Sequence, residues 1–274
     1  MATTHPFADE EPGNIPLSSA PLVRTIAQIK FPLLTQFSIN GDAVASAVAG
    51  ALIEHYPLLE VGQEVSVIIT SDGPSEQRSA TRIWRLVSAD RAWQVTFTGT
   101  FLSIDTTDYV RRRDFAQRLT NAWEALNQHV SVPYIERLGV RYINQVTDRE
   151  HLARLHELLR PEVLGIAMAQ DLDEAHLATA ITEAQYRFPD GAALTARWGM
   201  LPAGTNIENA SPPFDYPTWI LDTDSFCEFK HNSNSGQNLF EDVRALALRS
   251  YQFFRWAVTK DFISTFGGSS EHRD

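Results

Sequence analysis

The sequence of 274 residues has little cysteine and little charge: one cysteine is present, and charged residues make up 21% of the chain. A single thiol, Cys227, cannot form an intramolecular disulfide and is too few for a cysteine-based zinc or iron–sulfur site, which favours a reducing cytoplasm. No run of about 18 apolar residues occurs, so no membrane-spanning helix is expected. The first 21 residues have neither a basic start nor an apolar run, and they predict no signal peptide.

Basic residues are also scarce. The chain has 23 Lys and Arg against 34 Asp and Glu, which gives a formal net charge of −11. Nucleic-acid binding is not expected, because a surface that follows phosphates needs clustered Lys and Arg. The acidic balance favours a basic protein partner instead. With 43% hydrophobic residues, the chain is long enough for one large domain or two modest ones.

Common catalytic motifs are missing as well. The sequence has no Gly-x-Gly-x-x-Gly, no Gly-x4-Gly-Lys-Ser/Thr, no His-Glu-x-x-His and no Gly-x-Ser-x-Gly. We therefore predict no catalytic residue, cofactor or metal. Asp171–Glu174 and Asp222–Asp224 offer carboxylates for a hard cation, and Cys227 with His231 suggests a nucleophile and base. Acidic loops, helix caps and a partly buried cysteine are the favoured interpretations.

Hydrophobic periodicity indicates alternating strands and helices. Strands are expected over 22–34, 64–70, 82–87, 93–104, 135–146, 163–169, 178–188, 193–200 and 218–229, and helices over about 40–56, 108–130, 148–160 and 239–266. The turn Pro189-Asp190-Gly191 predicts a hairpin in which the glycine takes a positive φ.

The two halves repeat the same order of elements. They predict an α+β fold of internally duplicated β-α-β-β-β-α units, with a mostly antiparallel curved sheet and two long helices packed on one face. The predicted organisation is a disordered N-terminal tail (1–21), a single domain (22–266) made of half-repeats 22–132 and 133–266, and a flexible C-terminal tail (267–274). The alternative is two separate domains divided near Pro133, although no Gly/Ser linker marks that point.

Three segments carry a family resemblance: 22–32, 84–90 and, most specifically, Arg137-Leu138-Gly139-Val140-Arg141-Tyr142-Ile143-Asn144. The chain resembles, over nearly its whole length, a sporadically distributed family of uncharacterised bacterial proteins carrying an Arg-x-Gly-x-Arg-Tyr-Ile-Asn motif. The resemblance implies a bacterial origin and a one-domain length, and no activity. Patchy distribution is typical of mobile defence loci, such as toxin–antitoxin or phage-defence systems.

The Arg137–Asn144 segment is the main candidate site. In a strand, Arg137, Gly139 and Arg141 share one face while Tyr142 and Asn144 lie on the other. Gly139 would let a carboxylate, a phosphate or a backbone approach between the two arginines. Alternatively, the arginines pair with internal acids such as Asp90 or Asp105. The predicted ligand- or partner-binding residues are Arg137, Arg141, Tyr142, Asn144, Trp84 and Arg85.

Two further features concern charge and aromatic residues. Arg111-Arg112-Arg113, followed by Arg118, lies at the start of a long predicted helix, where cations are unfavourable. A phosphate or acidic partner could bind there, although a solvated face is favoured. The tryptophans on predicted strands would line a concave apolar surface if helices left the second sheet face uncovered; they are Trp84, Trp93, Trp198 and Trp219.

Three functions follow from these features. The favoured one is a non-enzymatic, acidic protein-interaction module, such as an antitoxin, immunity or accessory factor. The alternatives are a small-molecule or nucleotide-binding sensor that uses a sheet–helix cavity and Arg141, and an enzyme whose site no motif reveals. The oligomeric state, a homodimer included, is left open.

Overall fold

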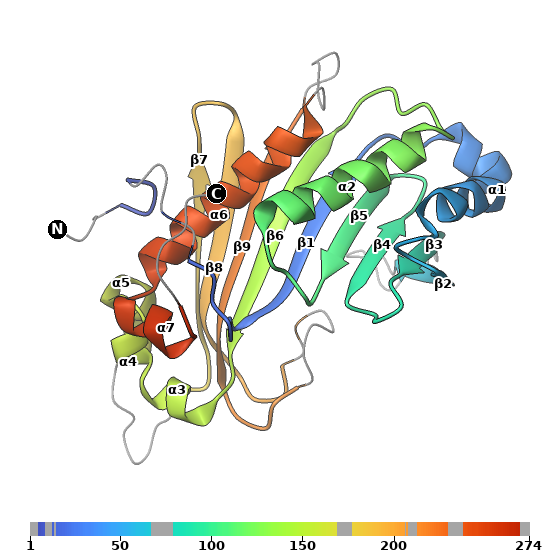
Figure 1. The fold of residues 1–274 in the computed structure, drawn as a ribbon. Helices are drawn as coiled ribbons and strands as arrows, with labels where there is room; N and C mark the ends of the chain where they lie inside the picture. Colours follow the sequence, from blue (N-terminus) through green and yellow to red (C-terminus); the bar gives the residue numbers. More distant parts are fainter. Residues whose placement is uncertain are drawn as a thin grey trace, which may run out of the picture.

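The fold is mixed α and β, with one antiparallel sheet of nine strands (Figure 1). It is taken from a computed structural model, which describes residues 5–8, 13, 15–66, 79–168, 177–205, 207, 213–229 and 238–268. The strands are β1 (Leu22–Lys30), β2 (Leu58–Ser66), β3 (Ser79–Val87), β4 (Trp93–Phe97), β5 (Phe101–Thr106), β6 (Arg137–Val146), β7 (Ala180–Arg187), β8 (Ala192–Leu201) and β9 (Thr218–Glu228). The helices are α1 (Thr35–Leu52), α2 (Arg112–Asn127), α3 (Arg149–Ala153), α4 (Leu155–Leu158), α5 (Pro161–Leu164), α6 (Leu239–Ala257) and α7 (Lys260–Thr265), with a 3₁₀ turn over Gly165–Met168.

The sheet is continuous across both halves of the sequence. Its strand order is β2-β3-β4-β5-β1-β6-β9-β8-β7, and neighbouring strands are antiparallel. The central pair is β1 and β6, in which Ala27 lies opposite Val140. The alternative of two domains divided near Pro133 is therefore wrong, because ladder hydrogen bonds join the halves at the centre of the sheet.

The core lies between the sheet and the helices. Figure 1 shows α2 and α6 crossing the same face of the sheet, with α1 beside the β2–β4 end. Phe115 and Leu119 of α2 and Val243 and Phe253 of α6 are fully buried against the sheet. Phe115 and Leu119 are four residues apart, and the buried residues of α6 recur at intervals of three and four from Val243 to Phe253, so each helix buries one stripe. Burying such side chains contributes about 1.5–3 kcal/mol each.

Several predicted elements differ from the structure. The single strand expected over 93–104 is two strands, because the turn at Thr98–Thr100 reverses the chain and Thr98 N donates to the Phe101 carbonyl (2.9 Å). The strand expected over 163–169 is wrong up to residue 168: Pro161 occupies the first helical position, and helical turns follow.

Helix boundaries differ too. The helix expected over 239–266 breaks at Val258, and Thr259 then caps α7 by accepting a hydrogen bond from Phe262 N (3.2 Å). The helix expected over 148–160 is divided at Arg154. The Pro189-Asp190-Gly191 hairpin is confirmed, with Gly191 at φ 88°.

Part of the segment predicted as a disordered N-terminal tail lies against the folded body. The Phe7 ring packs on Tyr186 and Phe188, each at 5.0 Å between centroids. Leu17 forms a β-bridge with Gly268. These apolar and backbone contacts offset the entropy of ordering the chain.

The predicted C-terminal tail lies outside the described residues from position 269 onward. Among the helices that the structure describes, none combines the length and apolar character needed to cross a bilayer.

Candidate functional site

The six residues predicted as a binding site are divided between the two faces of the sheet. Tyr142 and Asn144 point to the helix side, while Arg137 and Arg141 lie on the opposite face. This alternation follows the strand period, as expected. The six residues do not form one site.

The remaining two candidates, Trp84 and Arg85, are consecutive residues of β3, so their side chains lie on opposite faces of the sheet. Trp84 is buried under α1, with its ring 5.7 Å from Phe37, and its indole N–H donates to Asp42 (3.2 Å). Arg85 lies on the opposite face, where its guanidinium approaches Gly62. Trp84 therefore belongs to the core.

The face opposite the helices carries a ladder of arginine–aspartate pairs. Arg141 Nε and Nη2 each donate to Asp222 at 2.8 Å, and Arg137 Nη2 donates to Asp224 at 2.7 Å. The expected partners Asp90 and Asp105 are wrong for both arginines, because the β6–β9 register places two aspartates of β9 beside them.

Asp105 pairs with another arginine of the same face. Its carboxylate lies 3.1 Å from Arg24 Nη2. Burial raises the pKa of both Asp105 and Asp224, and the neighbouring arginines act against that rise. These pairs tie adjacent strands together, and a cation would have to displace an arginine to reach Asp222 or Asp224.

The space above Gly139 is filled from within the chain. A Cβ at this position would lie 2.5 Å from Arg137 Nη1. The same guanidinium lies over the Phe226 ring, 4.4 Å from its centroid. The gap predicted between the arginines is therefore occupied by Arg137 itself.

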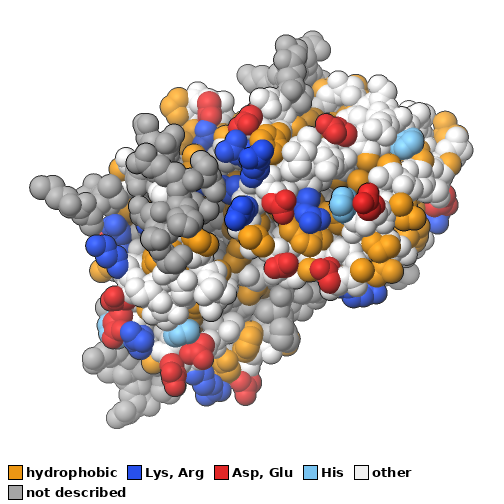
Figure 2. Space-filling model, viewed as in Figure 1, with side chains coloured by type: hydrophobic (Ala, Val, Ile, Leu, Met, Phe, Trp, Pro, Cys, Tyr) orange, Lys and Arg blue, Asp and Glu red, His pale blue; other side chains and the backbone are white. Residues whose placement is uncertain are grey.

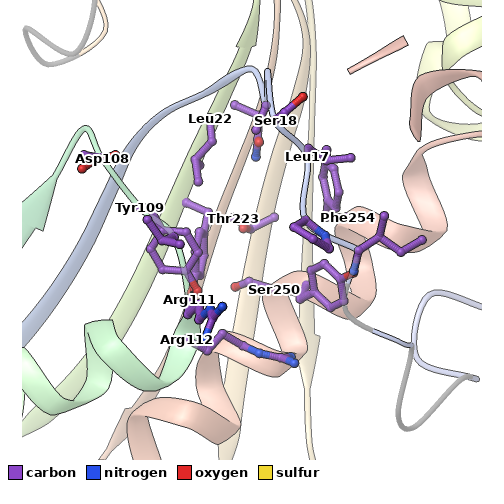
Figure 3. A pocket seen from close by; sticks show the side chains of 17 residues that line it. Leu17, Ser18, Leu22, Asp108, Tyr109, Arg111, Arg112, Thr223, Ser250 and Phe254 are labelled. Carbon is purple, nitrogen blue, oxygen red and sulfur yellow. The ribbon is translucent and has the colours of Figure 1, made fainter. Parts of the chain in front are cut away.

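On the helix side, the structure has a cavity of about 340 Å³ between the start of α2 and the middle of α6 (Figure 3). Its floor is the sheet, which contributes Leu22 of β1, Tyr142 and Asn144 of β6, and Thr223 of β9. Its other walls come from 108–112, from α6, and from the N-terminal segment 15–20, which we call the strap. Two of the six predicted residues thus line one cavity.

A tyrosine pair forms the polar centre of this cavity. The hydroxyl oxygens of Tyr109 and Tyr142 are 3.0 Å apart. Burial raises the pKa of Tyr142 to about 12, against the lowering effects of the Tyr109 hydrogen bond and the nearby Arg112 charge. Tyr142 therefore keeps its proton at neutral pH and acts as a hydrogen-bonding group, not a base.

The opposite wall contributes a buried hydroxyl from α6. Ser250 is 1% exposed, and its Oγ has no hydrogen-bond partner among the described residues. Figure 3 shows this hydroxyl directed toward the side of the cavity where Arg111 and Arg112 lie. A buried hydroxyl without a partner costs about 1–3 kcal/mol, so its position needs an explanation.

The start of α2 brings positive charge to the same place. The N-cap residue, Arg111, makes no side-chain capping hydrogen bond. Arg112 is half-buried, and its guanidinium lies over the Tyr251 ring, 5.1 Å from the centroid. The N-terminus of a helix is itself electropositive, so helix and arginines together favour an anion.

The strap is fixed to α6 and to the C-terminal region by hydrogen bonds. Ile15 N donates to the Tyr251 hydroxyl (2.9 Å), which donates to the Gly13 carbonyl (3.0 Å). Ser19 N donates to the Phe266 carbonyl (3.1 Å). The strap therefore forms one side of the cavity and is held in place by these hydrogen bonds.

No protein-family model and no curated protein matches this sequence. The resemblance to an uncharacterised bacterial family therefore stays a prediction from the Arg137–Asn144 motif.

The other sequence candidates are weaker in the structure. Burial raises the pKa of the Cys227 thiol, which disfavours the thiolate that a nucleophile needs. His231 and Asp171–Glu174 lie outside the described residues. Within the described ranges, no group of three or more His, Cys, Asp or Glu side chains is placed to hold a metal ion.

The tryptophans do not line an open apolar surface. Those considered on strands are buried on the helix side, in the two main core clusters; they are Trp84, Trp93, Trp198 and Trp219. On the helix face, Lys and Arg side chains are interspersed with Asp and Glu (Figure 2). Among the described residues, these tryptophans therefore do not form the concave apolar surface that was considered for the second face of the sheet.

Sequence reasoning missed Ser250, Thr223 and the strap as parts of the site. Serine in a helix and threonine in a strand carry no motif, and only folding brings them to one cavity. The run Arg111–Arg113 was a usable signal: positive charges at a helix start are unfavourable, which indicated an anionic ligand or partner there, and Arg111 and Arg112 do line the cavity.

Proposed function

We propose that this protein is a binding domain for a small organic molecule, held in the cavity between α2 and α6. The observation that carries the proposal is the cavity itself. Its volume of about 340 Å³ lies within the range of about 300–1,000 Å³ that is typical of ligand sites. Apolar side chains such as Leu22 and Phe254 surround a few converging polar groups, which is the usual composition of such sites.

Binding is favoured over catalysis by the titratable groups in the cavity. Those lining it are arginines, tyrosines and the exposed Asp108. An efficient general base has a pKa near 7, and the raised pKa of Tyr142 moves that group away from this value.

The strand order also supports the proposed internal duplication. On either side of the central β1–β6 pair, β5 corresponds to β9, β4 to β8 and β3 to β7. Each of β5 and β9 is the last strand of its half and precedes a helix, α2 or α6. In this interpretation the cavity lies between two equivalent halves, a common place for ligand sites.

A cavity-filling variant tests the proposal. Ser250→Trp places an indole in the cavity, and Ser264→Trp, at an exposed position on α7, is the matched control. A library of neutral and charged metabolites is screened by thermal shift. A ligand at about 100 times its dissociation constant adds about 2.7 kcal/mol, or roughly 5–10 °C for a chain of this size.

We expect hits that stabilise the native chain and the Ser264→Trp variant but not Ser250→Trp. Leu22→Trp fills the cavity from the sheet floor and replaces Ser250→Trp if that variant does not fold. A library without hits, or hits that bind both cavity-filled variants unchanged, would contradict the proposal.

A partner-binding role is a second candidate, and the edge strand β2 favours it. Leu59 and Val61, two residues apart on one face of β2, are 47% and 52% exposed. Strand β2 is the last in the strand order, so its outer backbone groups are not paired within the described sheet. A basic protein that adds a strand at β2 would cover these apolar side chains, and its positive charge would be attracted by the net negative charge of this protein.

A further inference from the structure

Three features of the cavity between α2 and α6 indicate the chemical class of its ligand. They are the start of α2, the buried Ser250 hydroxyl and the apolar side chains of the floor and strap. Each comes from a different part of the chain, so their agreement is informative.

The first feature is the positive charge at the start of α2, which faces the cavity. Two consecutive arginines that line the cavity, Arg111 and Arg112, lie at the start of α2, where the helix dipole already gives a partial positive charge. Asp114 is the acidic residue of the first turn, and its side chain is 62% exposed. The charges therefore favour an anion in front of the helix.

The second feature is the Ser250 hydroxyl, which is independent of α2. It is 1% exposed, has no hydrogen-bond partner among the described residues, and comes from the middle of α6. Figure 3 shows its hydroxyl directed toward Arg111 and Arg112, whereas the Asp108 side chain lies above them, at the upper left of the view. An anion at the start of α2 would accept the hydrogen bond that Ser250 can donate.

The third feature sets the rest of the ligand. Leu17, Leu22 and Phe254 line the same cavity and offer no hydrogen bonds from their side chains. A fully hydrated inorganic anion would leave this apolar surface in contact with water. An anion with an apolar body would bury it.

We infer that the ligand is a small organic anion, a carboxylate or a phosphate monoester, whose charged group lies between the start of α2, Arg112 and Ser250, and whose apolar part contacts Leu22 and Phe254. This inference rests on the proposed ligand-binding function. Carboxylate and phosphate share the acceptor oxygens that these groups recognise.

The test compares three probes on the full chain by calorimetric titration: 3-phenylpropanoate, phenyl phosphate and the neutral 3-phenylpropanol. We expect either or both anionic probes to bind at least tenfold more tightly than the alcohol. The anionic probe with the higher affinity identifies the charged group that the cavity binds. Tighter binding of phenyl phosphate indicates a phosphate monoester, and tighter binding of 3-phenylpropanoate indicates a carboxylate. Inorganic phosphate, which lacks the apolar part, should bind more weakly than phenyl phosphate.

Two substitutions locate the charged group. Ser250→Ala removes one hydrogen bond to an anion and should weaken the anionic probes about tenfold, with little effect on the alcohol. Arg112→Gln should weaken them similarly. Arg113→Gln is the matched control, because Arg113 is exposed and does not line the cavity, and it should leave binding within about twofold.

The two proposals fail in different ways. Equal binding of the alcohol and the anions, or anion binding that Ser250→Ala and Arg112→Gln leave unchanged, overturns the anionic class while ligand binding stands. The same conclusion follows if none of the probes binds but the library gives a neutral ligand that Ser250→Trp excludes. If neither probes nor library bind, both proposals fail.

Discussion

Gly139 of β6 and Gly199 of β8 test how closely neighbouring groups pack against the strands of the sheet. Gly139→Ala places a Cβ 2.5 Å from Arg137 Nη1, which is the end of a flexible side chain. The clash is relieved if the guanidinium moves, at the cost of its ion pair with Asp224 and its contact with the Phe226 ring. Each of these contributes roughly 0.5–1 kcal/mol in a partly exposed site.

The alanine itself offsets part of this loss in the free energy of unfolding, because alanine is favoured over glycine in a strand by roughly 0.5–1 kcal/mol. We therefore expect Gly139→Ala to lower the free energy of unfolding by about 1 kcal/mol. Gly199→Ala is the contrasting variant: Gly199 has φ 139°, and its Cβ would meet the backbone carbonyl of Ala180 in β7. No rotamer change relieves that clash, and a loss of roughly 3 kcal/mol or more is expected.

The measurement is urea unfolding at 25 °C, followed by tryptophan fluorescence and far-ultraviolet circular dichroism. The double variant with Arg137→Ala isolates the cause, because without the guanidinium an alanine at 139 meets no clash. We expect a coupling energy of about 1–2 kcal/mol between the two substitutions, since the alanine preference is the same in both backgrounds and cancels. Additive effects, or a Gly139→Ala loss as large as that of Gly199→Ala, would refute the reasoning.

Two other predictions concern Tyr142 and β2. The folded-state pKa of Tyr142 is raised from 10.0 to about 12, so its neutral phenol contributes stability that is fully present below pH 10 and is lost as the pH rises toward 12. Wild type should lose about 2–3 kcal/mol more than Tyr142→Phe across that window in urea unfolding, and an equal loss in both chains would rule this out. For the edge strand, capture from native lysate should enrich a basic protein with wild type and with Ile181→Lys on the opposite edge strand β7, but not with Val61→Lys. Retention of the same proteins by both variants would count against a role for β2.

Local periodicity was sufficient to predict much of the secondary structure. The alternation in β6 placed Arg137 and Arg141 opposite Tyr142, and the Asp190-Gly191 turn defined a hairpin. Errors occurred where local signals were ambiguous. The apolar run 163–169 has the composition of a strand, yet Pro161 starts a helical turn there.

The candidate site was only partly accessible from the sequence. Tyr142 and Asn144 were identified from the motif and line the cavity, but they were grouped with Trp84 and Arg85, which lie elsewhere on the sheet. Strand order decides such groupings, because residues far apart in the chain become neighbours only after the sheet has formed.

The sequence by itself determined the acidic charge, the mixed α and β class and the face on which each strand residue lies, because these depend on composition and local periodicity. Only the tertiary structure decided that β6 lies between β1 and β9, and this has two consequences. It gives Arg137 and Arg141 aspartate partners from β9, which makes them part of the sheet. It also brings α2 beside α6, so that Arg112, Tyr142 and Ser250 surround one cavity. Non-local pairing carries this information, and no window of sequence contains it.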